Sequence, residues 1–180
     1  MIEAEHRLVI DAGIDTVWNY VQHIEKWALL FPGCRECEVI DDHNSKWVIK
    51  VGAGGLVKTV NVLVTVNSWA GPERVDFSYR LETEPVVGSG SYTAIRQGTD
   101  ATEIGLHVQV EGSGQMAAMW EAMSRPLLPQ MAKTFAGRLK TEIESTADHQ
   151  PVAEVPVASG NPSILSRLMS WLKGLFGSGR

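Results

Sequence analysis

The stretch from Gln115 to Glu144, QMAAMWEAMSRPLLPQMAKTFAGRLKTEIE, decides the fold. Its large apolar side chains recur every three or four residues, a spacing that places them on one face of an α-helix. They are Met116, Met119, Trp120, Met123, Leu127, Met131, Phe135, Leu139 and Ile143. A helix of this length is about 45 Å long and can lie across a whole sheet. Pro126 and Pro129 each remove a backbone donor, so we expect a kink near residues 122–126.

The residues before this helix alternate between apolar and polar side chains. The clearest runs are 60–67, 74–81 and 103–110. Alternation with one polar face is typical of an antiparallel sheet that is covered on one side and solvated on the other. Turn-forming residues separate the runs at 41–44, 52–55, 71–72, 88–90 and 98–100.

The N-terminal part adds one more strand and a helical segment. Residues 2–10 alternate, and a helical apolar pattern follows over residues 17–24. Asp11 and Asp15 precede it, and Asp is a good N-cap, so we expect one or two short helices that end near Pro32. The order strand, two short helices, about six strands and long helix predicts an α+β helix-grip fold. In this fold a curved antiparallel sheet of about seven strands wraps around the long C-terminal helix.

The composition changes after residue 146, which divides the chain into a domain (1–146), a linker and a tail. Residues 147–161 are small, polar or Pro without periodicity, as is typical of a flexible linker. Residues 162–180 predict an amphipathic helix that begins after an N-cap at Asn161. Its apolar face consists of Ile164, Leu165, Leu168, Met169, Trp171, Leu172, Leu175 and Phe176.

Charge separates the tail from the domain. The whole chain has 180 residues and a net charge of −5, while the segment after Glu154 carries only Arg167, Lys173 and Arg180 and is therefore +3. The acidic remainder, at −8, argues against nucleic-acid binding, which depends on Lys and Arg. The tail helix is about 22 Å long, too short to cross a bilayer core of about 30 Å but suited to lying in the interface. The other interpretation is that it docks on the domain itself or in a groove of a partner protein.

Few residues favour metal or nucleophilic chemistry. Cys34 and Cys37 are the only cysteines, and the five histidines are scattered without the spacing of metal ligands. A redox pair or half a zinc site is the alternative interpretation, but the cysteines open a predicted strand rather than a helix. Motifs for nucleophilic catalysis or phosphate binding do not occur. The N-terminus has no basic or apolar export signal, so we expect a cytosolic protein without a transmembrane helix.

Several motifs resemble the CoxG family of carbon monoxide dehydrogenase proteins, within the START/Bet v 1-like (SRPBCC) superfamily. They are Val17-Trp18, Phe31-Pro32-Gly33-Cys34, Gly71-Pro72, Gly88 with Gly90, and Phe135, Arg138 and Leu139. The resemblance covers residues 1 to about 145 and implies a non-enzymatic accessory protein of a molybdenum hydroxylase such as CO dehydrogenase. It also implies location at the inner face of the cytoplasmic membrane and a respiratory quinone, menaquinone or ubiquinone, as a non-covalent ligand.

The apolar face of the predicted helix 115–144, the helix stripe, has two interpretations. Four methionines lie on it, and their flexible thioethers suit ligands of varied shape, although a methionine stripe is also common in ordinary cores. The resemblance implies an apolar cavity between helix and sheet, which favours ligand binding. The expected ligand-binding residues are Phe31, Phe77, Tyr79, Met116, Met119, Trp120, Met123, Leu127, Met131 and Phe135. We expect no catalytic residue and no metal. The competing functions are a cyclase or aromatase of similar fold, which would need an acid or base in the cavity, and a general lipid-transfer protein.

Overall fold

The computed structural model describes residues 1–53 and 55–148. Contacts divide the chain into residues 1–150 and 151–180, and the described residues belong to the first unit. Its elements are β1 (Ile2–Ile10), α1 (Ile14–Val21), α2 (Ile24–Ala28), β2 (Cys34–Val39), β3 (Asn44–Ala53), β4 (Leu56–Ala70), β5 (Arg74–Leu81), β6 (Val86–Gln97), β7 (Ala101–Gly112), the 3-10 turn η1 (Gly114–Met116) and α3 (Ala117–Asp148). The linker and tail-helix predictions, 147–161 and 162–180, fall almost entirely outside the described residues.

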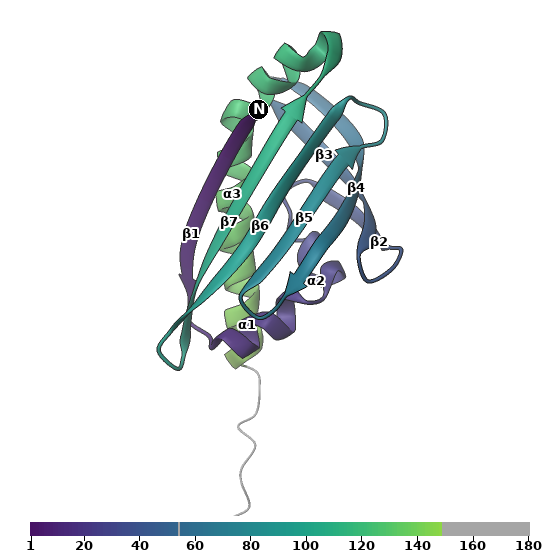
Figure 1. Ribbon diagram of the computed structural model, residues 1–180. Coiled ribbons are helices and arrows are strands. Elements are labelled where there is room, and N and C mark those ends of the chain that lie inside the picture. Colours follow the sequence, from purple (N-terminus) through teal and green to yellow (C-terminus); the bar gives the residue numbers. More distant parts are fainter. Residues whose placement is uncertain (54, 149–180) are drawn as a thin grey trace, which may run out of the picture. The chain divides into compact units, whose positions relative to one another are not determined.

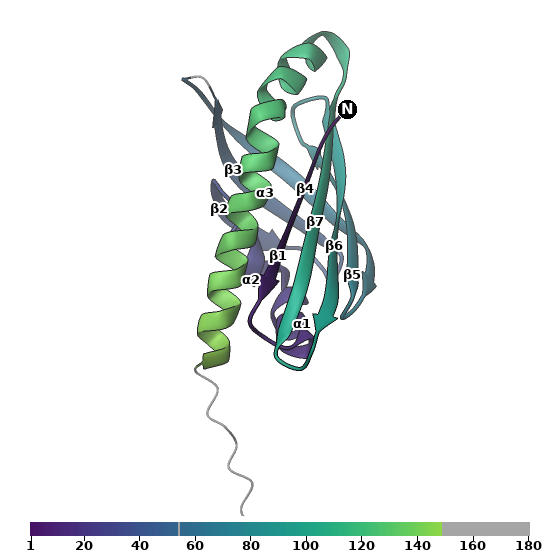
Figure 2. The ribbon, with the colours of Figure 1, turned by 90° about the vertical axis from the view of Figure 1, so that its left-hand side faces the viewer.

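The strands form one curved antiparallel sheet in the order β1-β7-β6-β5-β4-β3-β2, with the long helix α3 on its concave face (Figures 1 and 2). This confirms the α+β helix-grip fold predicted from the sequence. The first strand closes against the last, since β1 pairs with β7 along its whole length. The short helices α1 and α2 connect β1 to β2, which lie on opposite edges of the sheet.

Period-two patterning explains which side of the sheet is covered. In β4 the side chains of Val60, Val62, Val64 and Val66 are all buried, while their polar neighbours are more exposed. The alternation works because successive Cβ atoms in a strand point to opposite faces. The inward side chains of β4 and β7 therefore face α3 and form the core with it.

The predicted turn at residues 88–90 is wrong, because Gly88 and Gly90 lie inside strand β6. They stand directly opposite Tyr79 and Phe77 of β5. A Cβ at Gly88 would overlap the Tyr79 ring, and one at Gly90 would overlap the Phe77 ring. These glycines therefore let two aromatic rings lie flat on the inner face of the neighbouring strand, a pairing known to support glycine in sheets.

We expect Gly88→Ala to lower the free energy of unfolding by about 1–3 kcal/mol, because the added methyl group overpacks a filled site. The matched control is Gly137→Ala in α3, where an added Cβ meets no atom within 4 Å. That variant should gain about 0.5–1 kcal/mol, since alanine loses less backbone entropy in a helix. Denaturant unfolding of both variants measures the difference. Equal stability of the two would contradict the packing role assigned to Gly88.

Neither expected aspartate caps a short helix. The N-cap of α1 is Gly13 and that of α2 is His23, and neither makes a side-chain capping hydrogen bond. Asp15 instead lies in the first turn of α1. The backbone N–H of Asp11 donates to Glu144 Oε1 at 2.7 Å. Asp11 therefore fixes the end of β1 to α3, a long-range contact that local capping preferences do not reveal.

Helix α3 lies closest to β1 and β7. Its N-terminal turns lean away from the axis of the longer C-terminal part (Figure 2), and Pro126 and Pro129 both lie in the N-terminal half of the helix. Because the backbone of α3 approaches one side of the sheet, a wider space remains between the helix and the strands β3 to β5. That space contains the candidate site.

Candidate ligand-binding cavity

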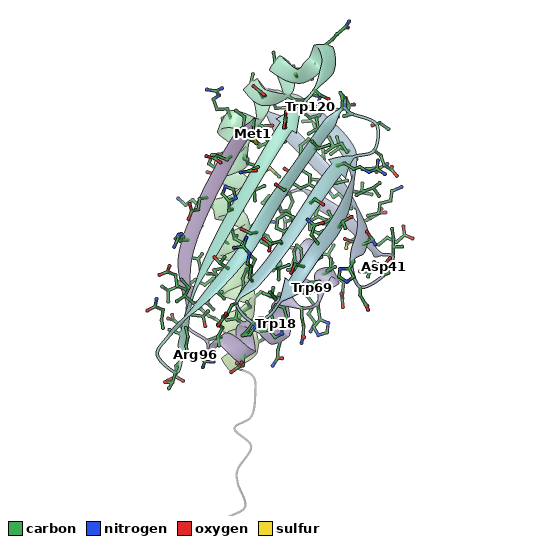
Figure 3. The ribbon with its side chains drawn as sticks, in the orientation of Figure 1. Met1, Trp18, Asp41, Trp69, Arg96 and Trp120 are labelled. Atoms are coloured by element: carbon green, nitrogen blue, oxygen red, sulfur yellow. The ribbon has the colours of Figure 1, made fainter. Side chains whose placement is uncertain are left out.

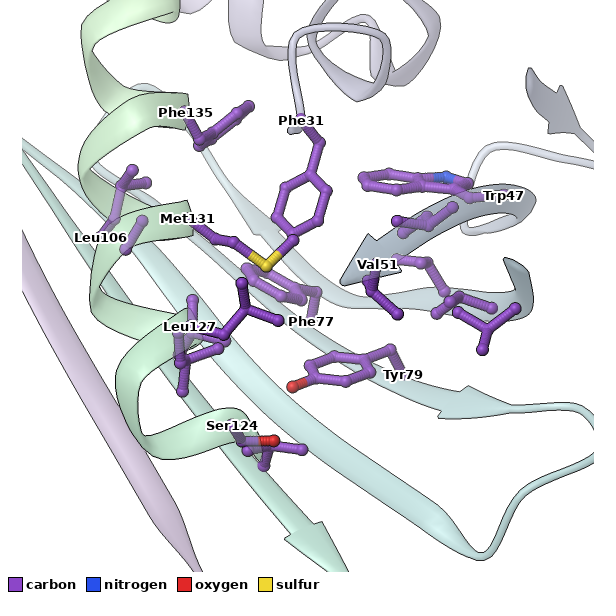
Figure 4. A pocket seen from close by; sticks show the side chains of 18 of the residues that line it. Phe31, Trp47, Val51, Phe77, Tyr79, Leu106, Ser124, Leu127, Met131 and Phe135 are labelled. Carbon is purple, nitrogen blue, oxygen red and sulfur yellow. The ribbon is translucent and has the colours of Figure 1, made fainter. Parts of the chain in front are cut away.

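A cavity of about 200 Å³ lies between α3 and the inner face of the sheet. Figure 4 shows Met131 in its middle, with its sulfur directed toward Phe31, Phe77 and Leu127. Eight of the ten residues predicted from the sequence line it, namely Phe31, Phe77, Tyr79, Trp120, Met123, Leu127, Met131 and Phe135. Helix, loop and sheet therefore meet at this cavity as expected, and ligand binding by these residues stays a prediction.

Met116 and Met119 do not line the cavity, and their predicted place in it is wrong. Met116 is 46% exposed and Met119 is 38% exposed. Met116 belongs to the 3-10 turn η1, whose rotation per residue differs from that of an α-helix. The α-helical spacing therefore does not place Met116 on the inward face of α3. Met119 lies at the edge of the stripe, one residue before the buried Trp120.

The sheet contributes more of the lining than the sequence suggested. Trp47, Ile49 and Val51 of β3 line one wall, and Tyr92 of β6 lines another. All four occupy inward positions of their strands, so extending the period-two pattern into β3 and β6 would have found them. The other sheet residues that line the cavity are Val60, Val62, Val64, Val75, Leu81, Val86, Ser91, Leu106, Val108 and Val110.

Four aromatic rings build the wall on the α2 side. Trp27 and Trp47 lie 5.4 Å apart, centroid to centroid, and Phe31 lies 5.9 Å from both Trp47 and Phe135. Their tilted and edge-to-face geometry is the favourable arrangement for aromatic pairs. The two indole N–H groups have partners, because Trp27 Nε1 donates to the Val21 carbonyl and Trp47 Nε1 to Ser45 Oγ.

The Phe-Pro-Gly-Cys segment positions Phe31 in this wall. Gly33 has a φ of +85°, a conformation that favours glycine. Its carbonyl accepts a hydrogen bond from the Lys50 N–H at 2.8 Å, so the segment is fixed to strand β3. A side chain at Gly33 would also overlap the Lys50 carbonyl. The motif therefore has a structural reason in this chain, namely close approach of a loop to a strand.

The cavity is almost wholly apolar. Within the described residues, no Asp, Glu, Lys, Arg or His side chain lines it. The lining residues that carry a side-chain hydroxyl are Tyr79, Tyr92, Ser91 and Ser124, and those that carry an indole N–H are Trp27, Trp47 and Trp120. Burial raises the pKa of both tyrosines, so their hydroxyls stay neutral at physiological pH. The arrangement can bind an apolar molecule by burial, at about 25 cal/mol per Å² of apolar surface.

The two cysteines lie in β2 and do not line the cavity. A register shift between Cys34 and Glu36 breaks the alternation, and both thiols are half-buried and packed against the core. Neither forms a disulfide. Burial raises the pKa of Cys34, and burial with the nearby charges of Cys34 and Glu25 raises the pKa of Cys37 to about 11. Their microenvironment disfavours the thiolate, which is the reactive form.

We expect the double variant Cys34→Ser, Cys37→Ser to keep its ligand binding. In the unmodified protein, alkylation by iodoacetamide should be slower at pH 7 than that of free cysteine, and the rate for Cys37 should rise as pH approaches 11. The sign follows from the raised pKa, because a smaller thiolate fraction is present at neutral pH. Peptide mass spectrometry after timed labelling measures the rates. Rapid alkylation at pH 7, or one bound zinc per chain, would show a reactive or metal-binding pair.

The histidines do not gather into a site. His107 is partly exposed on β7, and its Nε2 lies 3.6 Å from Glu3 Oε2 on β1. His6 occupies an inward position of β1 without lining the cavity. Across residues 1–53 and 55–148 no cluster of three His, Cys, Asp or Glu side chains could hold a metal ion. In the same part of the chain, no helix is long and apolar enough to cross a membrane.

The membrane-binding residues predicted from the sequence lie outside the described residues. They are Ile164, Leu165, Leu168, Met169, Trp171, Leu172, Leu175 and Phe176.

Solved structures share this fold. A conserved protein from Geobacillus kaustophilus has 16% identity and a TM-score of 0.70, over 81% of this chain and 97% of that one. The Zhui aromatase/cyclase from a Streptomyces species has 16% identity and a TM-score of 0.60, over 81% and 95% of the two chains. A START superfamily protein from Mycobacterium smegmatis has 14% identity and a TM-score of 0.60, over 80% and 98%. At these identities the likeness shows the START-like fold alone.

The sequence itself assigns the family. No curated protein matches the chain. A family model described as polyketide cyclase / dehydrase and lipid transport matches residues 1–145, which include every strand and nearly all of α3. The protein therefore belongs to the polyketide cyclase / dehydrase and lipid transport family.

Proposed function

We propose that the protein is a carrier that holds an apolar small molecule between α3 and the sheet without changing it chemically. The observation that carries this proposal is the lining of the cavity, which offers aliphatic and aromatic side chains and a few hydroxyls. General acid–base catalysis needs a titratable group near the operating pH within reach of the substrate. The raised pKa values of Tyr79 and Tyr92 take these hydroxyls far from that range.

The competing function is a cyclase-type enzyme, because the family and the fold include an aromatase/cyclase. Such an enzyme would have to work with neutral hydroxyls and bound water in this cavity. The two functions predict different fates of the bound molecule. A carrier releases its ligand unchanged, whereas an enzyme releases a product of different mass or absorbance.

The finer proposal is a CoxG-like accessory protein that takes a respiratory quinone from the cytoplasmic membrane and assists a molybdenum hydroxylase such as CO dehydrogenase. Two features support it. The Phe-Pro-Gly-Cys segment positions Phe31 in the cavity wall, and the C-terminal sequence 162–180 has the amphipathic pattern of an interfacial helix. An apolar ligand of this kind resides in the bilayer, so the carrier must work at its surface.

Mass spectrometry of the bound molecule tests this function. We expect the full-length protein, after incubation with vesicles that contain menaquinone or ubiquinone, to carry one unaltered quinone per chain. The control is the same protein incubated with vesicles that lack quinone. Protein that takes up no quinone and no other lipid would contradict the carrier function. A bound lipid in place of quinone would leave a general lipid carrier, and a chemically altered ligand would favour the enzyme.

A further inference from the structure

Two buried side-chain polar atoms in the described residues have no hydrogen-bond partner, namely Tyr92 Oη and Trp120 Nε1. Both residues line the cavity. Tyr92 is 5% exposed and Trp120 is 4% exposed, so bulk water does not reach them readily. A buried polar group without a partner is costly, and buried groups of this kind are nearly always paired in native proteins.

Tyr79 provides the contrast that makes Tyr92 informative. Both are tyrosines on the inner face of the sheet, both line the cavity, and burial raises the pKa of both. The Tyr79 hydroxyl donates to the Gln109 carbonyl at 2.7 Å, so its hydrogen-bonding need is met within the protein. The Tyr92 hydroxyl has no such acceptor. One cavity tyrosine is therefore structural, and the other is available to a ligand.

The residues that carry the two unpaired groups stand at different levels of the sheet. Tyr92 is in one cross-strand row with Val75 and Trp69, and the Trp69 ring contacts Trp18 of α1. Trp120 packs against Gly112, which pairs with Val86 at the other end of β6. Figure 3 shows Trp69 and Trp120 at opposite ends of the sheet. Val86 and Tyr92 are six positions apart along β6, which corresponds to about 20 Å of strand.

The chemistry of the two groups defines what they can receive. An indole N–H donates only, and a neutral phenol hydroxyl donates well and also accepts. We propose, on the basis of the general carrier function above and not of its quinone form, that the ligand is an elongated apolar molecule with a hydrogen-bond-accepting oxygen near each end; a respiratory quinone has its oxygens together on one ring. Tyr92 receives one oxygen, and Trp120 receives the other. The aliphatic and aromatic lining between them holds the apolar stretch.

A graded set of probes tests the proposal on the full-length protein. Dodecane, 1-dodecanol and 1,12-dodecanediol share one chain and carry no, one and two terminal oxygens. Each probe displaces a fluorescent apolar dye, and the ratio of the diol affinity to the dodecane affinity is compared between variants. A change in cavity volume alters the affinities of dodecane and the diol alike, because both have the same carbon chain. The ratio of the two affinities therefore reports only the contribution of the oxygens.

We expect Tyr92→Phe to lower the diol-to-dodecane ratio about tenfold, the loss of one buried hydrogen bond to a ligand. Trp120→Phe should lower the same ratio by a similar factor. The control Tyr79→Phe should leave it unchanged, because that hydroxyl is already bonded to Gln109. Thermal unfolding without ligand checks the fold, and Tyr92→Phe should not lower the midpoint, since it removes an unpaired group.

The possible failures are distinguishable. If the unmodified protein binds all three probes and Tyr92→Phe leaves the diol-to-dodecane ratio unchanged, Tyr92 does not bind a ligand oxygen. The carrier function is not contradicted by that result. An equal fall in the ratio for Tyr92→Phe and Tyr79→Phe would also overturn the role assigned to Tyr92. If the unmodified protein binds none of the probes and no quinone or lipid, both the carrier function and this inference fall.

Discussion

Met131→Trp should abolish uptake of apolar ligands, with a loss of affinity of at least about tenfold, while the protein stays folded. The side chain of Met131 lies in the middle of the cavity (Figure 4), which measures about 200 Å³. An indole there fills much of the space that a ligand would occupy. Because the new side chain enters an existing void rather than a packed core, it should cost little stability. Dye displacement measures binding, and thermal unfolding measures stability.

The matched control is Met119→Trp, which makes the same change on the same helix. Met119 is 38% exposed and does not line the cavity, so this variant should bind ligand like the unmodified protein. Loss of binding in both variants would point to a general effect on α3. Unimpaired binding in folded Met131→Trp would show that the ligand binds elsewhere, and the cavity would then be an ordinary packing defect.

Deletion of residues 162–180 should abolish sedimentation with anionic vesicles and leave the unfolding transition of the domain unchanged. The deleted segment carries the predicted membrane-binding residues, and large apolar side chains contribute about 1.5–3 kcal/mol each when fully buried. Part of this gain is offset by the cost of ordering the helix. Every element of the sheet and α3 lies before residue 149, so we expect the domain to fold without the tail.

Substitutions in the tail separate apolar insertion from charge attraction. Leu172→Glu with Phe176→Glu should act like the deletion, through lost burial and repulsion from anionic lipid. Arg167→Gln with Lys173→Gln should weaken binding only modestly, since each cation near such a surface contributes about 1 kcal/mol. Equal sedimentation of truncated and full-length protein would show that the tail binds protein rather than membrane.

These two predictions address different steps of one carrier function. The first concerns the place where the ligand is held, and the second concerns access to the bilayer. A variant that fails in the first test should still bind vesicles, and a truncated protein should still bind a water-soluble apolar dye. Loss of both properties in both variants would mean that the two steps are not separable as proposed.

The amino-acid sequence was sufficient to predict the order of the elements and the inward faces of the clearest strands. Periods of two and of 3.6 residues follow directly from strand and helix geometry, so Val62 in β4 and Leu139 in α3 could be placed in the core from spacing alone. The turn at 98–100 likewise follows local preferences, and Gly98 has a positive φ there. The pattern failed where it extended a helical stripe into the 3-10 turn at Met116.

Only the tertiary structure decided which inward residues line a cavity and which are packed core. Helix α3 lies closest to β1 and β7, so Ile143 is fully buried away from the cavity while Met131 faces into it. Gly88 looked like part of a turn because its actual partner, the ring of Tyr79, belongs to another strand. The hydroxyl of Tyr92 became informative only once every neighbour was known. The physical reason is that local periodicity depends on the geometry of one element, whereas enclosed volume and unmet hydrogen bonds depend on distances between elements far apart in the chain.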